Sequence, residues 1–431
     1  MTAELHLEGP APLRGRLRVP GDKGISHRAL LFAALADGRS RVAGLADGDD
    51  VARTRAALAA LGVRLGGEGP SVTVDGAGVD ALREPAVVLD CANSGTTMRM
   101  AAGLLAGRPF HAVLTGDESL LRRPMGRVVE PLRAMGARVD GRADGEYGPL
   151  AIRGGPLVGR RHVVPVASAQ VKTALLLAGL QAAGTTEVVE PALSRDHSER
   201  MLAALGAPVA RTGPASVRVE AGAPRAFELE VPGDPSSAAF FVVAAAVTPG
   251  SELVLEGVAL NPTRLGFVEV LARMGAPVEV RVLEERLGEP VGELSVRSAP
   301  LVGTVVAGDE VPRLVDEVPA LAVAAAFADG VTEFRDVAEL RVKESDRVAA
   351  LEQELGQLGV GVETGPDRLV VRGGAPGPAT LKSHGDHRVA MAAAVAANAV
   401  AGASTVRGWA AVAASYPRFA EDLAALTGRG R

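Results

Sequence analysis

The sequence contains very little cysteine and few aromatic residues. Its single cysteine, Cys91, excludes an internal disulfide and a cysteine-based metal cluster. Aromatic residues make up 3% of the 431 residues and hydrophobic residues 47%, so the core must be built from Ala, Val and Leu, whose small side chains let helices approach closely. No apolar run reaches the roughly 20 residues of a membrane span, and the start lacks the basic-then-apolar layout of a secretion signal. We therefore expect a cytoplasmic protein with no membrane partner.

Lysine is scarce, although basic residues are common. The net charge is −5, which gives no reason to expect a nucleic-acid partner. Of the 46 basic residues only four are lysine, namely Lys23, Lys172, Lys343 and Lys382. Where lysine is kept against such a background, a compact and titratable ammonium is favoured over a planar guanidinium. Lys23 and Lys343 are therefore candidate functional residues, whereas Lys382 is as readily a chance survivor on the surface.

One supersecondary pattern recurs six times along the chain. Each copy has an Ala-rich helical run, a glycine and a β-rich stretch, and the glycines lie 66 to 80 residues apart. Glycine suits the left-handed position just after a helix end. A second motif, L-x-x-L-G or L-x-x-M-G, follows in five copies and predicts a second amphipathic helix before a strand. The six glycines are Gly38, Gly107, Gly184, Gly250, Gly330 and Gly402.

Charged and hydroxyl residues precede the first helix of every copy. Free N–H groups and the helix dipole at such an end attract anions. If the copies form two symmetric groups of three, all six ends face one cleft, which would suit ligands with phosphates and carboxylates. The six segments are GDKGISHR (21–28), DCANSGTTMR (90–99), SAQVK (168–172), PGDPSS (232–237), LVDEVP (314–319) and GDHR (385–388).

Several of these segments resemble the motifs of one enzyme family. GDKGISHRALL, NSGTTMR, SAQVKTALLLAGL, SRDHSERML, RVKESDR and GDHRVAMAAA are similar, in this order, to motifs of the 3-phosphoshikimate 1-carboxyvinyltransferases. The SAQ and SRDH sequences resemble those of one bacterial subgroup of the family. The resemblance extends over about residues 13–423.

The resemblance implies an α/β fold with two domains. Each domain would contain three βαβαββ units, arranged as an inside-out α/β barrel. Residues 21–231 would form one domain, and residues 1–20 together with 232–431 the other. A Pro-Gly pair lies at each expected crossing, Pro20-Gly21 and Pro232-Gly233, which suits a hinge. Substrate binding is therefore expected to close the cleft.

The reaction implied by the resemblance transfers the enolpyruvyl group of phosphoenolpyruvate to the 5-hydroxyl of 3-phosphoshikimate. The methylene carbon is protonated, the hydroxyl attacks the neighbouring carbon, and the tetrahedral intermediate then loses phosphate. No metal or other cofactor is expected, because arginine and lysine neutralise the anions. The resemblance also implies inhibition by glyphosate, and we expect a monomer.

Three residues are implied as catalytic. Asp316 would be the base near the 5-hydroxyl. Glu344 is the candidate that moves the proton to and from the methylene carbon, and Lys23 is the competing assignment. Lys343 and Arg347 are four residues apart, so we expect both on one helical face, where two cations would grip one anion.

The two substrates would share part of the site. The residues implied for 3-phosphoshikimate are Lys23, Gly24, Arg28, Ser168, Ala169, Gln170, Ser194, Arg195, Asp316 and Lys343. Those implied for phosphoenolpyruvate are Lys23, Asn93, Gly95, Arg123, Gln170, Lys343, Arg347 and Arg388. Lys172 either supports the phosphate site or covers a helix surface, while Ser198 and Glu199 are expected to cap a helix N-terminus.

Two glycines refine these expectations. Gly24 stands where the family usually has serine, so the backbone N–H is kept but a hydroxyl is lost. A neutral hydrogen bond contributes about 0.5–1.5 kcal/mol, so we expect weaker acceptor binding rather than lost activity. Gly95 matches the glycine beside phosphoenolpyruvate, and because family members with alanine there resist glyphosate, we expect sensitivity.

Three alternatives remain open. The first is a UDP-N-acetylglucosamine enolpyruvyl transferase, which carries its cysteine on a mobile loop. Cys91 instead directly precedes a helix start, where a small buried thiol is the favoured interpretation. The second is a relative that acts on a shikimate analogue. The third is a non-catalytic binding protein, which the retention of Lys23, Asp316, Glu344 and Arg388 disfavours.

Overall fold

The computed structural model describes residues 3–429, which divide into two compact units. Unit 1 takes the residues up to Pro20, residues 232–284 and the residues from 290 onward, and unit 2 takes residues 21–231 and 285–289. The chain therefore changes unit after Pro20 and after Val231. It also makes a short excursion at residues 285–289, the tip of a hairpin, which the sequence did not predict.

Unit 2 is built from three four-stranded sheets with the orders β16-β3-β5-β4, β6-β7-β9-β8 and β11-β13-β15-β14. In each sheet the first two strands are parallel and the other pairs are antiparallel. This identical pattern is the internal repeat seen in the sequence. The strands are β3 (Asp37–Ala43), β4 (Arg64–Gly66), β5 (Val72–Ala77), β6 (Leu89–Asp90), β7 (His111–Thr115), β8 (Arg138–Arg142), β9 (Tyr147–Arg153), β11 (Arg161–Val163), β13 (Thr186–Val189), β14 (Val209–Gly213), β15 (Ser216–Val219) and β16 (Glu228–Glu230), with a short parallel pair β10 (Leu157–Val158) and β12 (Ala182–Ala183).

The helices of unit 2 alternate between a buried and an amphipathic type. Helices α1, α3 and α5 are buried along nearly their whole length, because most of their side chains are apolar and buried polar ones such as Arg28 and Lys172 have partners on other elements. Helices α3 and α5 approach so closely that a Cβ on Gly103 would lie 2.1 Å from the carbonyl oxygen of Ala174, so only glycine fits there. The helices are α1 (Lys23–Leu35), α2 (Asp49–Ala60), α3 (Gly95–Ala106), α4 (Gly126–Met135), α5 (Ala169–Gly179) and α6 (His197–Ala204).

Unit 1 repeats this four-stranded pattern in the sheets β18-β19-β17-β2 and β20-β21-β23-β22, and its third sheet, β1-β25-β24, has three strands. In the third sheet, β1 from the start of the chain pairs antiparallel with β25, the place that a hairpin strand takes in the other sheets. The strands are β1 (Glu4–Gly9), β2 (Arg14–Leu17), β17 (Glu252–Ala259), β18 (Val278–Arg286), β19 (Glu289–Arg297), β20 (Val305–Val306), β21 (Val331–Phe334), β22 (Gly361–Gly365), β23 (Arg368–Arg372), β24 (Thr380–Lys382) and β25 (Gly402–Arg407). The helices are α7 (Pro235–Val247), α8 (Gly266–Arg273), α9 (Val318–Ala326), α10 (Arg347–Gln357), α11 (His387–Ala399) and α12 (Phe419–Thr427).

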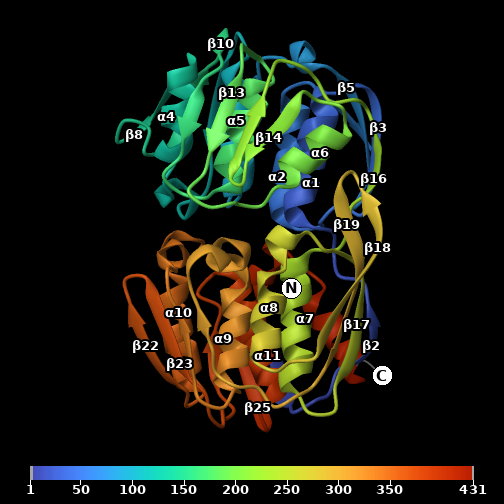
Figure 1. The fold of residues 1–431 in the computed structure, drawn as a ribbon, viewed down its shortest axis with the longest axis vertical. Coiled ribbons are helices and arrows are strands. Elements are labelled where there is room, and N and C mark those ends of the chain that lie inside the picture. The colour runs from blue at the N-terminus through green and yellow to red at the C-terminus, as the bar shows by residue number, and fades with distance from the viewer. Residues whose placement is uncertain (1–2, 430–431) are drawn as a thin grey trace. The chain divides into compact units, whose positions relative to one another are not determined.

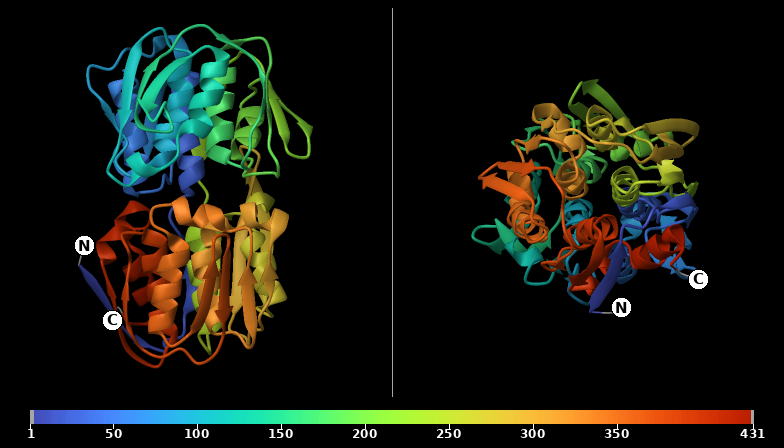
Figure 2. Two further views of the ribbon diagram at one scale, coloured as in Figure 1. Left: turned by 90° about the vertical axis from the view of Figure 1, so that its left-hand side faces the viewer. Right: turned by 90° about the horizontal axis from the view of Figure 1, so that it is seen from below.

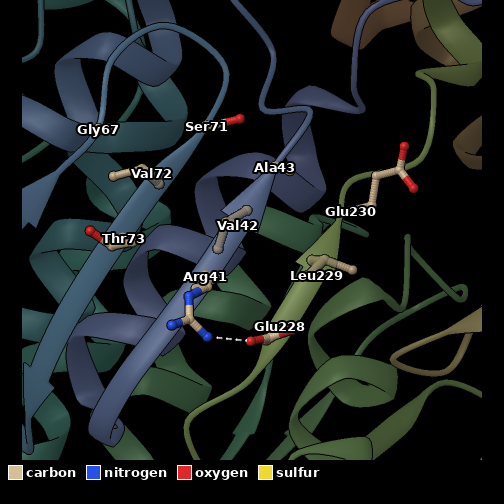
Figure 3. A pocket seen from close by; sticks show the side chains of 10 residues that line it. All are labelled: Arg41, Val42, Ala43, Gly67, Ser71, Val72, Thr73, Glu228, Leu229 and Glu230. Carbon is tan, nitrogen blue, oxygen red and sulfur yellow. Dashed lines mark hydrogen bonds and ion pairs between the residues drawn. The ribbon is translucent and has the colours of Figure 1, made fainter.

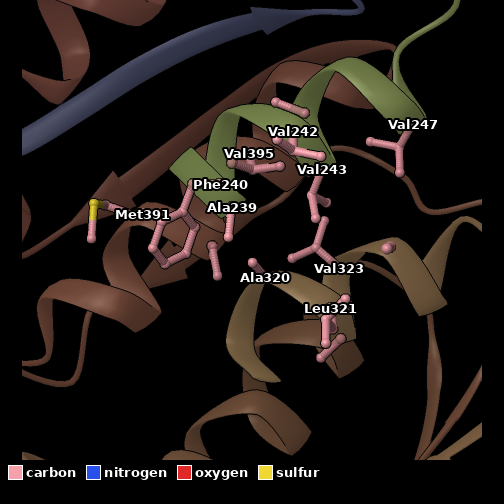
Figure 4. Close-up of a cluster of buried hydrophobic side chains, with 14 of the residues drawn as sticks. Ala239, Phe240, Val242, Val243, Val247, Ala320, Leu321, Val323, Met391 and Val395 are labelled. Atoms are coloured by element: carbon pink, nitrogen blue, oxygen red, sulfur yellow. The ribbon is translucent and has the colours of Figure 1, made fainter. Parts of the chain in front are cut away.

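The core of unit 1 lies where α7, α9 and α11 contact one another, with the strands outside them (Figures 1 and 2). Phe240, Val243, Val323 and Val395 interdigitate there (Figure 4), and all are buried. The arrangement of helices inside and sheets outside confirms the expected inside-out α/β barrel with two times three βαβαββ units.

The six repeated glycines do not all serve the same backbone purpose. Five have positive φ as expected, but Gly107 has a φ of −88°, so the left-handed prediction is wrong there. A Cβ on Gly107 would lie 2.5 Å from Oε1 of Gln181, so close packing selects glycine at this position.

Candidate active site

Polar side chains cap five of the six helix N-termini predicted to bind anions, the exception being that of α9. In unit 2, Asp22, Ser94 and Ser168 each accept the N–H three residues ahead, at 2.7, 3.2 and 3.5 Å. In unit 1, Asp234 and Asp386 accept the N–H two residues ahead, at 2.7 and 2.8 Å. Each cap fixes where its helix begins and leaves other N–H groups of the first turn for a ligand.

The three buried helices of unit 2 are joined at these ends by long polar side chains. Arg28 of α1 donates to Thr173 Oγ1 of α5 at 2.8 Å. Gln170 of α5 donates to Thr96 Oγ1 of α3 at 2.9 Å and accepts from Arg99 Nη1 at 2.6 Å. The ends of α1, α3 and α5 therefore meet within unit 2.

Lys23, the first residue of α1, forms an ion pair that the sequence did not predict. Its Nζ lies 3.0 Å from Oδ2 of Asp50 at the start of α2. The side chains of Lys23 and Asp50 are 19% and 11% exposed, so the pair is sheltered but reachable. The run DGDD (47–50) was the available signal, but acidic residues at a helix start are usually explained by the helix dipole alone.

Arg28 lies buried among three helices. Besides Thr173, it donates to Ser198 Oγ at 2.7 Å and to the carbonyl oxygen of Gly24 at 2.9 Å. Burial lowers the pKa of Arg28 to about 10, and the neighbouring Arg195 charge acts in the same direction. The two neighbouring cations, Arg28 and Arg195, are suited to bind an anionic ligand.

The geometry of α6 corrects the sequence prediction for Ser198 and Glu199. We expected both to cap the helix, but the N-cap residue is Asp196, whose side chain makes no capping hydrogen bond. Ser198 instead contacts Arg28 and Thr173, and Glu199 forms an ion pair with Lys172. Buried cationic partners on other helices outcompete the local backbone, which is why a local motif was misleading.

Three of the residues predicted for phosphoenolpyruvate in unit 2, Asn93, Gly95 and Arg123, cluster at the start of α3. Arg123 donates to the carbonyl oxygen of Asn93 at 3.3 Å and to its Oδ1 at 2.5 Å. A Cβ on Gly95 would lie 2.9 Å from Nη1 of Arg99 and 3.5 Å from Nη1 of Arg123. Gly95 therefore brings backbone N–H groups and two guanidinium groups to one place.

The phosphate-site candidates Ser168, Ala169 and Gln170 begin α5, where each is partly exposed. Ser194 is buried, and its Oγ has no hydrogen-bond partner among the described residues. These groups provide hydroxyl and N–H donors beside Arg28 and Arg195.

In unit 1, three cations converge on Asp316, which lies in the 3₁₀ helix η5 (Val315–Glu317) before α9. Its Oδ1 lies 3.2 Å from Nη1 of Arg347 and 3.5 Å from Nζ of Lys343. Arg388 donates to the carbonyl oxygen of Asp316 at 2.9 Å. Arg347 also holds Glu344, at 2.6 Å. All the catalytic and cationic residues predicted for this part of the chain are thus brought together.

The local prediction for Lys343 and Arg347 is wrong in detail. Lys343 is the C-cap residue after the 3₁₀ helix η6 (Ala338–Val342), and Arg347 begins α10, so the two do not share a helical face. They nevertheless grip one carboxylate, that of Asp316. The turn between η6 and α10, rather than a shared helical face, brings the two cations to the same carboxylate.

Asp386 is a further residue that the sequence analysis missed. It is fully buried, and its Oδ2 accepts from Nε of Arg347 at 2.8 Å. Burial acts to raise the pKa of Asp386, but the charge of Arg347 outweighs it and the pKa is lowered. Burial would lower the pKa of Arg347, yet Asp386, Glu344 and Asp316 together raise it. The GDHR motif predicted a polar helix start and a substrate contact for its arginine, but it did not indicate that its aspartate anchors the cluster.

Cys91 is buried, and burial raises the pKa of its thiol to about 12. The thiol is therefore neither a nucleophile nor an acid at neutral pH. We expect Cys91→Ser to change kcat and KM by less than about twofold, because the substitution keeps the size of a small buried side chain. Steady-state assays would check this, and a large loss of kcat with unchanged thermal stability would contradict it.

Other features do not coincide with these residues. A pocket of about 480 Å³ on the surface of unit 2 lies over β3, β5 and β16, where Arg41 pairs with Glu228 (Figure 3), and it contains none of the predicted site residues. Within residues 3–429, no group of three or more His, Cys, Asp or Glu side chains is placed to hold a metal ion. None of the described helices has the length and apolar character needed to cross a membrane.

The fold and the charged helix ends define an enolpyruvyl transferase architecture. The solved enolpyruvyl transferase NikO from Streptomyces tendae matches with a TM-score of 0.79 at 21% identity, covering 98% of this chain and 96% of that one, which shows the shared fold. EPSP synthase from Acinetobacter baumannii matches with a TM-score of 0.88 at 39% identity, covering 99% and 98%.

Sequence comparison narrows the class further. The profile of the family EPSP synthase (3-phosphoshikimate 1-carboxyvinyltransferase) matches residues 7–423. Proteins named 3-phosphoshikimate 1-carboxyvinyltransferase from a Synechococcus species and from Thermus thermophilus are each 54% identical, over 96% of this chain and 94% and 97% of theirs. The chain belongs to the EPSP synthase family.

Proposed function

We propose that this protein transfers the enolpyruvyl group of phosphoenolpyruvate to the 5-hydroxyl of 3-phosphoshikimate and releases phosphate. The observation that carries the proposal is the charge cluster of Asp316, Lys343, Glu344 and Arg347, which pairs candidate proton-transfer groups with cations. The family membership over nearly the whole chain supports the same reaction. We further propose that the protein acts as a cytoplasmic monomer.

The cations supply the electrostatic part of this chemistry. We propose that Arg123, Arg347 and Arg388 bind phosphoenolpyruvate, together with Lys23, Asn93, Gly95, Gln170 and Lys343. Each guanidinium is already held by protein partners, so its position is set before the substrate arrives. Preorganised cations stabilise charge that develops on phosphate and carboxylate groups in the transition state.

We assign the acceptor to Arg28, Ser168, Ala169, Gln170, Ser194 and Arg195, with Lys23, Gly24, Asp316 and Lys343. At Gly24, a Cβ would lie 3.1 Å from Oδ1 of Asp22 and 3.3 Å from Nη1 of Arg28. A serine there would therefore have to displace the N-cap of α1 or the guanidinium slightly. Gly24 keeps the backbone N–H for the ligand and leaves Arg28 undisturbed.

Proton transfer is assigned to the carboxylates. We propose that Asp316 accepts the proton of the 5-hydroxyl, because Lys343 and Arg347 fix the position of its carboxylate. Glu344 is proposed to protonate the methylene carbon and later to remove a proton from it. Lys23 is the alternative for that step. That the two sets of residues surround one pair of substrates stays a prediction.

The experiment that tests the function follows phosphate release from phosphoenolpyruvate and 3-phosphoshikimate. Shikimate, shikimate analogues and UDP-N-acetylglucosamine are each tested separately in place of 3-phosphoshikimate. Phosphate release with 3-phosphoshikimate and with none of the other acceptors supports the proposal. Turnover only with another acceptor, or binding of both substrates without phosphate release, would contradict it.

Glyphosate is proposed as an inhibitor that occupies the phosphoenolpyruvate site. A Gly95→Ala variant should need roughly tenfold more glyphosate for half inhibition and should show a higher KM for phosphoenolpyruvate, because the added methyl must push the Arg99 guanidinium aside. Initial-rate measurements at fixed acceptor concentration would check both values.

Gly356→Ala is the matched control, since a Cβ there meets no atom within 4 Å. It should leave both values unchanged. Full activity of the wild-type enzyme in millimolar glyphosate would be incompatible with the proposed inhibition.

A further inference from the structure

A buried ion cluster in unit 2 lies outside the residues assigned above. Lys172 of α5 places its Nζ 2.7 Å from Oε2 of Glu190 and 2.8 Å from Oε1 of Glu199. The three side chains are 2%, 1% and 7% exposed. The Lys172 side chain is therefore buried, so it does not cover a helix surface, and any support that it gives to the phosphate site must be indirect.

The cluster holds the backbone of two acceptor-site residues. Oε1 of Glu190 accepts the N–H of Ser168 at 3.1 Å, and its Oε2 accepts the N–H of Ser194 at 3.4 Å. Lys172 Nζ lies 3.4 Å from the carbonyl oxygen of Ser194. Glu190 thus holds the N–H of Ser194 and Lys172 holds its carbonyl group, and Glu190 also holds the N–H of Ser168 at the start of α5.

The hydroxyl of Ser194 is left out of this arrangement. Its Oγ is buried and has no hydrogen-bond partner among the described residues, which is costly unless a ligand completes it. The backbone of Ser194 is therefore held while its side chain is kept for another group.

Lysine suits this position better than arginine does. The compact ammonium offers three donors from one point, which matches two carboxylates and one carbonyl around a single atom. A planar guanidinium would need more room between Glu190 and Glu199, which are closed off from solvent. This explains why one of only four lysines in the chain is retained at position 172.

We propose that Lys172, Glu190 and Glu199 form a positioning cluster that sets the affinity for the phosphate of the acceptor. The cluster acts through Ser168 and Ser194 and does not touch the substrates itself. The inference rests on the proposed function, because it names the acceptor subsite of the same enzyme.

The test compares Lys172→Met, Lys172→Arg and Glu190→Gln with the control Lys382→Met, whose side chain is exposed on β24. KM for each substrate and kcat are measured, together with the Kd of 3-phosphoshikimate by calorimetry without phosphoenolpyruvate. We expect KM and Kd for 3-phosphoshikimate to rise about 10- to 100-fold in the cluster variants, since misplaced binding groups lose contacts of that size. KM for phosphoenolpyruvate should change less than about threefold, and Lys172→Arg should not restore affinity.

Thermal unfolding separates this role from simple destabilisation. If Lys172→Met does not fold, Glu190→Gln keeps the test, because it retains the Lys172–Glu199 pair and nearly the same shape. Unchanged acceptor affinity in a folded Glu190→Gln variant, or equal losses for both substrates, would overturn the proposal. If the wild-type protein neither binds nor converts 3-phosphoshikimate, the proposed function itself has failed.

Discussion

A Glu344→Gln variant is expected to fold and to bind both substrates while kcat falls about 10²- to 10⁴-fold, the usual contribution of a general acid–base group. Glutamine keeps the shape and an oxygen that can accept from Arg347 Nη2, the contact that holds Glu344 at 2.6 Å. It cannot give up or take a proton at the methylene carbon. Phosphate release measures kcat, and deuterium incorporation from solvent into the methylene group reports the protonation step.

The matched control is Glu352→Gln on the exposed face of α10, which should leave kcat unchanged. The same pair of measurements on Lys23→Met decides between the two candidate proton carriers. If Glu344→Gln keeps near-normal exchange while Lys23→Met abolishes it, the assignment passes to Lys23. In that case Glu344 would serve only to hold Arg347.

The repeated architecture was predictable because it is encoded locally. Each buried helix has a polar start and an Ala-rich run, and a glycine follows or ends each run, so the period and the βαβαββ order can be followed without any long-range contact. The same reasoning failed at Gly107, where the requirement for glycine comes from Gln181, which lies far along the chain.

The candidate site was predictable in its membership but not in its internal partners. The motifs predicted Lys23, Arg28, Asp316 and Arg347 as site residues from the residue type and the surrounding sequence. Their partners lie far along the chain, as with Arg28 and Ser198, which are 170 residues apart. No local pattern carries such a pairing, so Asp50 and Asp386 were missed.

The role of Glu199 was misjudged for a related reason. A carboxylate in the first turn of a helix satisfies the local expectation of a favourable dipole contact. The stronger influence is the ammonium of Lys172, which lies 2.8 Å away in a buried setting. Where a charge is buried, the partner that neutralises it decides its conformation over a weak local preference.

An Arg347→Met variant should lose about 3–5 kcal/mol of stability at neutral pH, the usual result of removing one partner from a buried ion pair. Arg347 is 1% exposed and contacts Asp386, Glu344 and Asp316, so its loss leaves three carboxylates without their shared cation. The melting temperature should fall by about 6–20 °C. Activity should fall with it, because Asp316 and Glu344 would no longer be held.

Arg341→Met is the control for losing an arginine from the same segment. Arg341 pairs with Asp346, but the two side chains are 27% and 39% exposed, so the pair is screened by solvent and its loss should cost less than about 1 kcal/mol. A similar fall in melting temperature for both variants would show that the buried cluster around Arg347 contributes no more to stability than the exposed pair does.

Protonation of Asp386 should change the stability of the wild type and of Arg347→Met in opposite directions. In the wild type the folded-state pKa of Asp386 is lowered, so its contribution to stability is present above the unfolded value of about 3.9 and is lost as the pH falls through the folded value. In Arg347→Met, burial is no longer outweighed and the folded-state pKa is raised, so Asp386 destabilises the protein at neutral pH and this penalty is relieved on acidification. The difference in melting temperature between the two proteins should therefore shrink as the pH is lowered from 8 to 5. A difference that stays constant over this range would mean that the Asp386 carboxylate finds another cation or water, and that Arg347 is not its main support.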